Sequence, residues 1–145
     1  MPRADFYIVP EPAVPYRFVC QLAEKVRNEG YDIYIHAATR EEAGTIDDLL
    51  WTFRDTSFVP HAVIDSTGGM EDYPVIIGWK GEEPLRRQVL INLSAATPGQ
   101  TDAYDRIIEV VPSAAEEWQQ ARLRYKDYRA RGLEMHSHNI ESTRA

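Results

Sequence analysis

A chain of 145 residues has the length of one domain and can bury a core without disulfides or metals. Its formal net charge of −7 argues against broad, nonspecific binding to nucleic acid, which needs many cations against the phosphates. Cys20 is the single cysteine, which excludes an intrachain disulfide and fits a reducing compartment. The sequence has no signal-peptide pattern and no apolar run of membrane-spanning length, so we expect a cytoplasmic protein.

Strand and helix patterns alternate along the first half of the chain. Apolar or alternating residues predict strands at residues 6–9, 31–36, 63–64, 75–79, 89–93 and 104–111. Helical periodicity predicts helices at residues 16–28, 39–51 and 113–131. This order predicts a single α/β domain with a mainly parallel sheet flanked by helices. The residues after Met135 are polar and patternless, so we expect a domain of residues 1–134 and a flexible tail of residues 135–145.

Local signals support the ends of the predicted helices. Thr39 and Ser113 each begin a capping-box sequence, with a glutamate three residues later. Gly30 and Gly132 follow the first and the last helix and provide the usual stop signal. The boundaries of these helices therefore rest on specific residues as well as on periodicity.

The last predicted helix carries an apolar stripe beside a cationic edge. At 100° per residue the stripe consists of Ala114, Trp118, Ala121, Tyr125 and Tyr128. Beside it lie Arg122, Lys126 and Arg129, at spacings of four and three residues. Residues 121–132 carry five basic residues and one acid, a net charge of +4 in a chain of −7. A charge run on a helix is usually a solvated face, but this edge also fits an anionic ligand with an apolar end.

Motifs for catalysis or phosphate binding are absent from the sequence. The loop after the first predicted strand, residues 10–15, has no glycine, lysine or serine, so neither a Walker A nor a dinucleotide fingerprint is present. The four histidines do not form a metal-ligand pattern, and no nucleophile accompanies His36. Cys20 falls inside a predicted helix and is interpreted as structural. We therefore predict no metal, no cofactor and no enzymatic activity.

Three stretches form a distinctive set. The first is Phe6-Tyr7 together with the following helix, which contains Val19-Cys20 and Ala23. The second is Leu50-Trp51 followed by Ser-Phe-Val-Pro-His at residues 57–61. The third is Val110-Val111-Pro112 followed by Arg-x-x-Tyr-Lys-x-Tyr-Arg at residues 122–129. Together they closely resemble the chi subunit family of bacterial DNA polymerase III holoenzyme, over nearly the whole chain and in similar order. The second and third motifs are the specific ones.

The resemblance implies a non-catalytic adaptor of the replisome. Chi proteins have an α/β fold like that of nucleotide-binding domains, yet they bind no nucleotide. They bind the acidic C-terminal tail of single-stranded-DNA-binding protein, which ends in an apolar residue. They also pair with the psi subunit, which links chi to the clamp loader. The net charge of −7 and the lack of an apolar run of membrane-spanning length predict no strong direct binding to DNA and no membrane.

The family's binding residues carry over one at a time. The tail-binding residues fall on Val111, Arg122, Tyr125 and Lys126. One further family lysine falls on Trp118, which implies a more apolar and less cationic pocket in this chain. Arg129 is placed by the helical spacing to meet tail acids further along. The psi-facing surface falls on Trp51, Phe58, Val59 and Pro60.

Two other classes of function stay open as alternatives. A small α/β nucleotide-binding domain or an enzyme of unknown substrate would need phosphate-binding glycines or paired catalytic groups. A direct binder of single-stranded DNA would use the basic helix and its aromatic residues, although the net charge of −7 counts against it.

Overall fold

The computed structural model describes residues 2–10, 15–52, 61–63, 74–79, 88–94, 104–112 and 115–140. Within these ranges the elements follow one another as β1 (Arg3–Val9), α1 (Tyr16–Asn28), β2 (Ile33–His36), α2 (Arg40–Thr52), β3 (His61–Val63), β4 (Val75–Gly78), β5 (Val89–Asn92), β6 (Arg106–Pro112), α3 (Ala115–Ala130) and β7 (Glu134–Asn139). The predicted strands and helices are all present, with boundaries that shift by a few residues.

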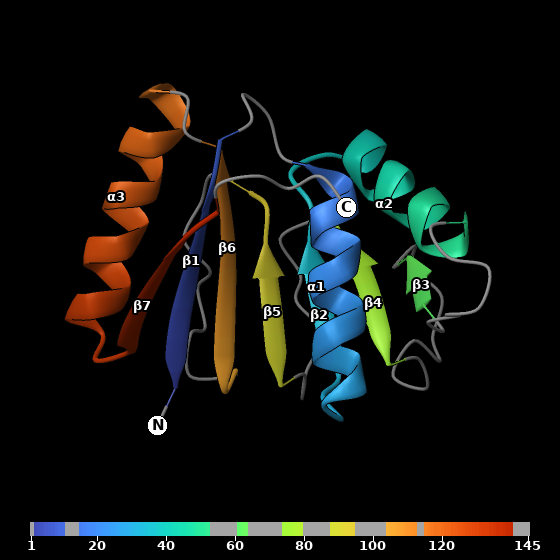
Figure 1. The fold of residues 1–145 in the computed structure, drawn as a ribbon, viewed down its shortest axis with the longest axis horizontal. Coiled ribbons are helices and arrows are strands. Elements are labelled where there is room, and N and C mark those ends of the chain that lie inside the picture. Colours follow the sequence, from blue (N-terminus) through green and yellow to red (C-terminus); the bar gives the residue numbers. More distant parts are fainter. Residues whose placement is uncertain are drawn as a thin grey trace.

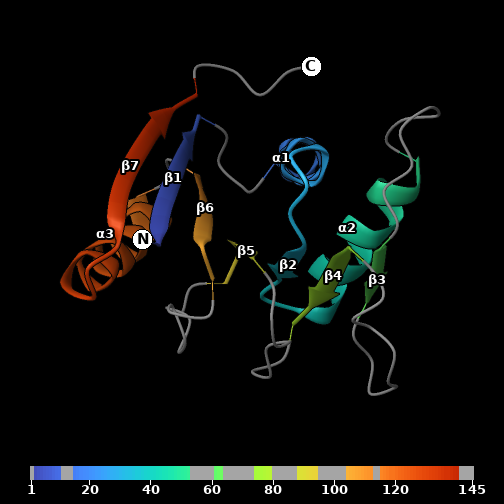
Figure 2. The same ribbon diagram turned by 90° about the horizontal axis from the view of Figure 1, so that it is seen from below.

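The strands form one sheet in the order β3-β4-β2-β5-β6-β1-β7 (Figure 1). Every described strand pair is parallel, which confirms the predicted parallel sheet. Helices α1 and α2 cover one face of the sheet, and α3 covers the other face at the end formed by β6, β1 and β7 (Figures 1 and 2). The predicted α/β fold class is therefore confirmed.

Alternation along the strands divides the core between the two faces. On β6, Ile107 and Val111 pack on the side of α3, whereas Ile108 and Val110 pack on the side of α1 and α2. Ala121 and Tyr128 of α3 belong to the same hydrophobic cluster as Ile107 and Val111. A parallel sheet buried on both faces needs apolar residues on both sides of its strands. Four of the five residues at 107–111 are apolar, which is why this segment predicts a strand, and the exception is Glu109.

The ends of the helices follow the predicted signals. Thr39 Oγ1 accepts a hydrogen bond from the backbone N–H of Glu42 (3.1 Å), and Glu42 Oε1 accepts one from the backbone N–H of Ala38 (2.7 Å). The capping box at α2 is thus formed, with its second bond one residue earlier than usual. Gly30 and Gly132 have φ of +95° and +91°, the left-handed conformation that ends a helix at lowest cost with glycine. Ser113 lies outside the described residues.

Strand β7 corrects the prediction of a flexible tail after Met135. It pairs in parallel with β1 over all six of its residues, so the fold continues past residue 134. The sequence did not reveal this strand because its side chains are exposed or only half-buried and lack an apolar alternation. Its stabilisation comes instead from pairing with a strand at the opposite end of the chain. Residues 141–145 lie outside the described residues.

A buried carboxylate joins β7 to the rest of the sheet. Asp5 Oδ1 accepts hydrogen bonds from Arg3 Nη2 (2.7 Å) and His138 Nε2 (2.8 Å), and Asp5 Oδ2 accepts one from Arg106 Nε (2.7 Å). The ring of His138 stacks on Tyr7, with ring centroids 4.6 Å apart. Burial would raise the pKa of Asp5, but these three donors outweigh it and hold the pKa at about 2.

We expect Asp5→Asn to lower the free energy of unfolding at pH 7 by about 2 kcal/mol. The reason is that the asparagine cannot provide the stabilisation that accompanies the lowered pKa of the folded carboxyl group. A depressed pKa contributes stability that is present above the ordinary value of 3.8 and lost as the pH falls toward 2. The free energy of unfolding of the wild type, measured with urea, should therefore fall as the pH is lowered through this window. Asp5→Asn should lack this pH-dependent loss.

Asp127→Asn is the matched control for this prediction. Asp127 of α3 forms an exposed ion pair with Arg131, the residue after the helix (3.1 Å), so its loss should change stability by less than about 1 kcal/mol. If Asp5→Asn unfolded with the same pH profile as the wild type, the assigned role of Asp5 would be wrong.

Candidate functional site

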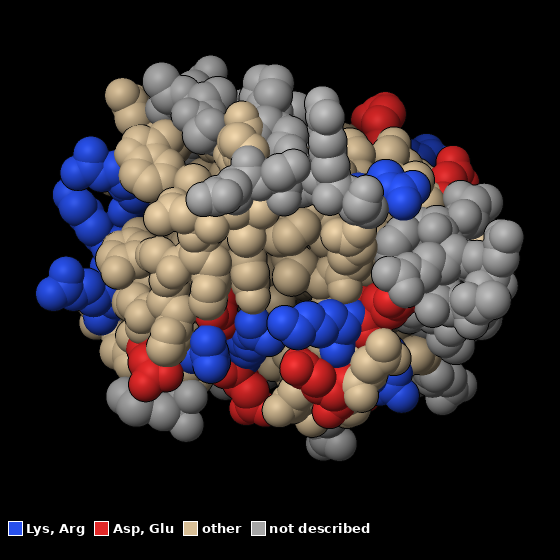
Figure 3. All heavy atoms as spheres, viewed as in Figure 1, with Lys and Arg blue, Asp and Glu red and all other residues tan. Residues whose placement is uncertain are grey.

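Helix α3 presents its cations on one exposed side. Arg122, Lys126 and Arg129 are exposed and form no ion pair with any other residue that the structure describes. Figure 3 shows Lys and Arg atoms gathered along the margin of the molecule where α3 lies. The predicted cationic edge is therefore present in the fold. Unpaired surface cations are available to an anionic ligand at no cost in broken ion pairs.

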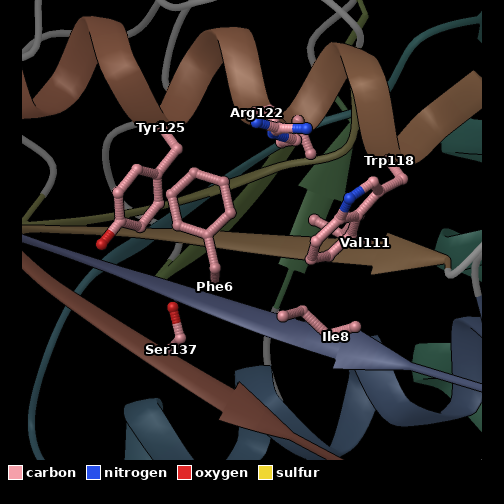
Figure 4. A pocket seen from close by; sticks show the side chains of 8 residues that line it. Phe6, Ile8, Val111, Trp118, Arg122, Tyr125 and Ser137 are labelled. Carbon is pink, nitrogen blue, oxygen red and sulfur yellow. The ribbon is translucent and has the colours of Figure 1, made fainter.

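An apolar pocket of about 210 Å³ lies beside these cations, between α3 and the sheet (Figure 4). Its lining residues are Phe6 and Ile8 of β1, Val111 of β6, Ser137 of β7, and Trp118, Ala121, Arg122 and Tyr125 of α3. Strand register explains this grouping, since Phe6 lies opposite Ser137 and Ile8 lies opposite Val111. Four elements from both ends of the chain thus converge on one site.

Aromatic side chains form the wall of the pocket. The ring of Tyr125 packs edge-to-face on Phe6, with centroids 5.3 Å apart and planes at 61°. Trp118, which is 39% exposed, lies toward the other end of the pocket, with Arg122 between the two aromatic residues along the helix (Figure 4). An apolar hollow with a guanidinium at its rim can take an apolar side chain and a carboxylate together.

Arg124 does not belong to the cationic edge, although it lies between Arg122 and Lys126 in the sequence. It is 7% exposed, and its Nε donates to Glu109 Oε1 (3.1 Å) beneath the helix. Glu109 is fully buried on β6, and its Oε2 accepts hydrogen bonds from the Tyr128 hydroxyl (2.6 Å) and Asn92 Nδ2 (2.9 Å). The count of five basic residues in residues 121–132 therefore overstates the positive surface.

The network around Glu109 fixes α3 on the sheet. Burial raises the pKa of Glu109 and of Tyr128. The Tyr128 phenol therefore stays protonated and donates a hydrogen bond to the carboxyl group of Glu109. Tyr128 also packs on Phe6, with ring centroids 5.9 Å apart, and thereby connects the network to the pocket. Contacts on the buried side of α3 set the orientation of Arg122 and Tyr125 on the pocket side.

The structure brings together four of the six residues that the sequence predicts for this site. Val111, Trp118, Arg122 and Tyr125 line the pocket, whereas Lys126 and Arg129 follow along the exposed side of α3 and do not line it. Sequence reasoning missed Phe6, Ile8 and Ser137 as site residues. Alternation along β1 places Phe6 and Ile8 on one face, which is a usable signal, but Ser137 falls in the strand that was predicted as a tail.

The structure describes only one of the four residues that the sequence predicts for the psi-facing surface. Trp51 lies at the end of α2 and is 53% exposed. Phe58, Val59 and Pro60 lie outside the described residues. The assignment of this surface to a partner stays a prediction.

Other reactive groups do not form a site in the described part of the chain. Groups of three or more His, Cys, Asp or Glu side chains that could hold a metal do not occur among the described residues. Cys20 is buried, and burial raises the pKa of its thiol to about 12, which makes it a poor nucleophile. Of the helices described, none has the length and apolar character needed to cross a membrane.

The fold defines an α/β protein with an apolar pocket between α3 and a parallel sheet, and comparison with known proteins gives its family. The family model described as "DNA polymerase III chi subunit, HolC" matches residues 1–136. The chain therefore belongs to the DNA polymerase III chi subunit family, whose members are accessory subunits of the replication machinery.

Three relatives support this assignment along the full length. DNA polymerase III subunit chi of Pseudomonas aeruginosa is 33% identical over 143 residues, which cover 97% of this chain and 98% of the relative. The chi subunit of Haemophilus influenzae is 32% identical and covers 94% of this chain and 96% of its own length. The chi subunit of Escherichia coli is 28% identical, with 94% and 97% covered.

Proposed function

We propose that this chain is a non-catalytic adaptor subunit that binds the acidic C-terminal tail of single-stranded-DNA-binding protein at the α3 pocket. The observation that carries the proposal is the position of Arg122, a cation without an ion pair among the described residues, at the rim of an apolar pocket. A tail of this kind offers an apolar terminal side chain, an α-carboxylate and preceding acids. Each of these has a matching feature in the site.

The site supports a division of roles among the cations of α3. The guanidinium of Arg122 can hold the α-carboxylate through two parallel hydrogen bonds, while Phe6, Trp118 and Tyr125 enclose the apolar side chain. Lys126 lies one turn further along the helix and Arg129 almost one turn beyond it, so both can meet acids that precede the terminal residue. The chain's net charge of −7 makes this local cationic edge the part of the surface that suits an acidic peptide.

The proposal includes a second partner surface. We assign Trp51, with Phe58, Val59 and Pro60, to the psi subunit, which would link this chain to the clamp loader. The exposure of a large aromatic ring at the end of α2 supports this assignment, since tryptophan is enriched at protein interfaces. Trp51 belongs to α2, which packs on β3 and β4, whereas the α3 pocket lies at the other end of the sheet, so both partners can bind at once.

We expect micromolar binding of full-length single-stranded-DNA-binding protein that is lost when its C-terminal tail is removed. Binding should weaken between about 0.05 M and about 0.5 M salt, because exposed ion pairs are screened at high ionic strength. Biolayer interferometry with the immobilised wild-type chain measures both effects. Equal binding of intact and truncated protein would contradict the proposal, and strong binding to bare oligonucleotide would favour direct DNA binding instead.

A further inference from the structure

The outer edge of β7 offers backbone hydrogen-bonding groups next to the pocket. Strand β7 is last in the sheet order, and its described neighbour is β1 alone. The backbone N–H of Glu134 donates to the Pro2 carbonyl (3.0 Å), and that of Ile140 donates to the Ile8 carbonyl (2.9 Å). Because these groups alternate along a strand, the N–H and C=O groups of the odd-numbered residues point away from β1. These residues are Met135, Ser137 and Asn139.

This edge is continuous with the pocket. Ser137 lines the pocket with its side chain and directs its backbone groups to the open edge. Met135, two residues earlier, packs against the cluster on the same face. A peptide that leaves the pocket past Ser137 therefore reaches the β7 edge without crossing another described element.

The charges beside the edge favour an acidic strand. Helix α3 lies next to β7 and runs in the opposite direction (Figure 1), so Arg122, Lys126 and Arg129 succeed one another from the pocket toward the start of β7. The acid of β7, Glu134, lies at its first position and is paired with His136 (2.8 Å). Residues 135–139 carry no acidic side chain.

We propose that the peptide whose C-terminal residue occupies the pocket also adds a strand to the β7 edge. The N–H groups of Ser137 and Asn139 donate to its carbonyl groups, and its own N–H groups donate to the carbonyls of β7. The order of the cations on α3 makes this strand parallel to β7, with its carboxylate at Arg122 and its earlier acids near Lys126 and Arg129. This inference rests on the proposed function and adds a binding mode to it.

The test is a scan of N-methylated peptides against the intact chain. The probe is a synthetic C-terminal peptide of the organism's own single-stranded-DNA-binding protein, methylated at one backbone nitrogen at a time. N-methylation at positions that face β7 should weaken binding about threefold to tenfold, and at the intervening positions by less than about twofold. Because the change is made in the peptide, the fold of the protein is not disturbed.

Hydrogen exchange of the complex gives a second readout. The amides of Ser137 and Asn139 should exchange more slowly when the peptide is bound, while those of His136 and His138, which point toward β1, should change little. A flat methylation profile, or unchanged exchange at Ser137 and Asn139, overturns the added strand. If the unmodified peptide still binds and Arg122→Ala still weakens it, the proposed function stands without the strand; if the unmodified peptide does not bind, both fail.

Discussion

Replacing Arg124 with alanine is expected to lower the free energy of unfolding by about 3–5 kcal/mol. The guanidinium of Arg124 is nearly buried and pairs with Glu109, which is fully buried on β6. Removal of the cation leaves a carboxyl group in the core without its counter-charge, and that group must then bind a proton or remain poorly solvated. Urea unfolding at pH 7 measures the loss.

Arg122→Ala is the matched control for this loss. It removes the same side chain from the same helix two residues earlier, but Arg122 is exposed, so stability should change by less than about 0.5 kcal/mol. The double variant Arg124→Met with Glu109→Gln should recover a large part of the stability, because a neutral amide can still accept from Tyr128. A loss below about 1 kcal/mol in Arg124→Ala would show that the buried pair does not hold α3 on the sheet.

Arg122→Ala is expected to weaken binding of the acidic tail peptide about 5-fold to 150-fold, which corresponds to about 1–3 kcal/mol. The reason is the loss of charge-assisted hydrogen bonds to the terminal carboxylate at the rim of the pocket. Fluorescence anisotropy of a labelled peptide measures the affinity of each variant. Arg122→Lys should recover only part of it, because lysine provides a point charge without the planar fork.

The position of the other cations gives this prediction its control. Arg129 lies almost two turns from Arg122 and does not line the pocket, so Arg129→Ala should weaken binding much less. Lys126→Ala should fall between the two. Equal losses in all three variants would mean that the peptide responds to general charge and not to a defined carboxylate site.

Much of the fold could be predicted from local patterns. Alternation and apolar runs marked the strands, and Thr39, Gly30 and Gly132 marked helix ends, because these signals depend on neighbouring residues only. Strand β7 carries no such signal. Its polar sequence becomes a strand through backbone pairing with β1 and through the bond between His138 and Asp5, which lie 133 residues apart.

The sequence predicts the residues that α3 contributes to the candidate site, but it misses those that β1 and β7 contribute. The period of α3 placed Trp118 and Tyr125 in one stripe and Arg122 beside it, and the pocket contains all three. Ser137 could not be predicted as a site residue, because β7 itself was not predicted. Arg124 was grouped with the surface cations because its partner, Glu109, lies on another element and within an apolar strand, where sequence alone does not pair them.

The most direct test of the central claim is calorimetric titration of the wild-type chain with the C-terminal peptide of its own single-stranded-DNA-binding protein, beside Arg122→Ala. We expect saturable binding at one site of the wild type and binding by the variant that is weaker by about fivefold or more, with Arg124→Ala excluded because its stability is impaired. Absence of binding by the wild-type chain, or equal binding by Arg122→Ala, would contradict the assignment of the α3 pocket as the tail-binding site.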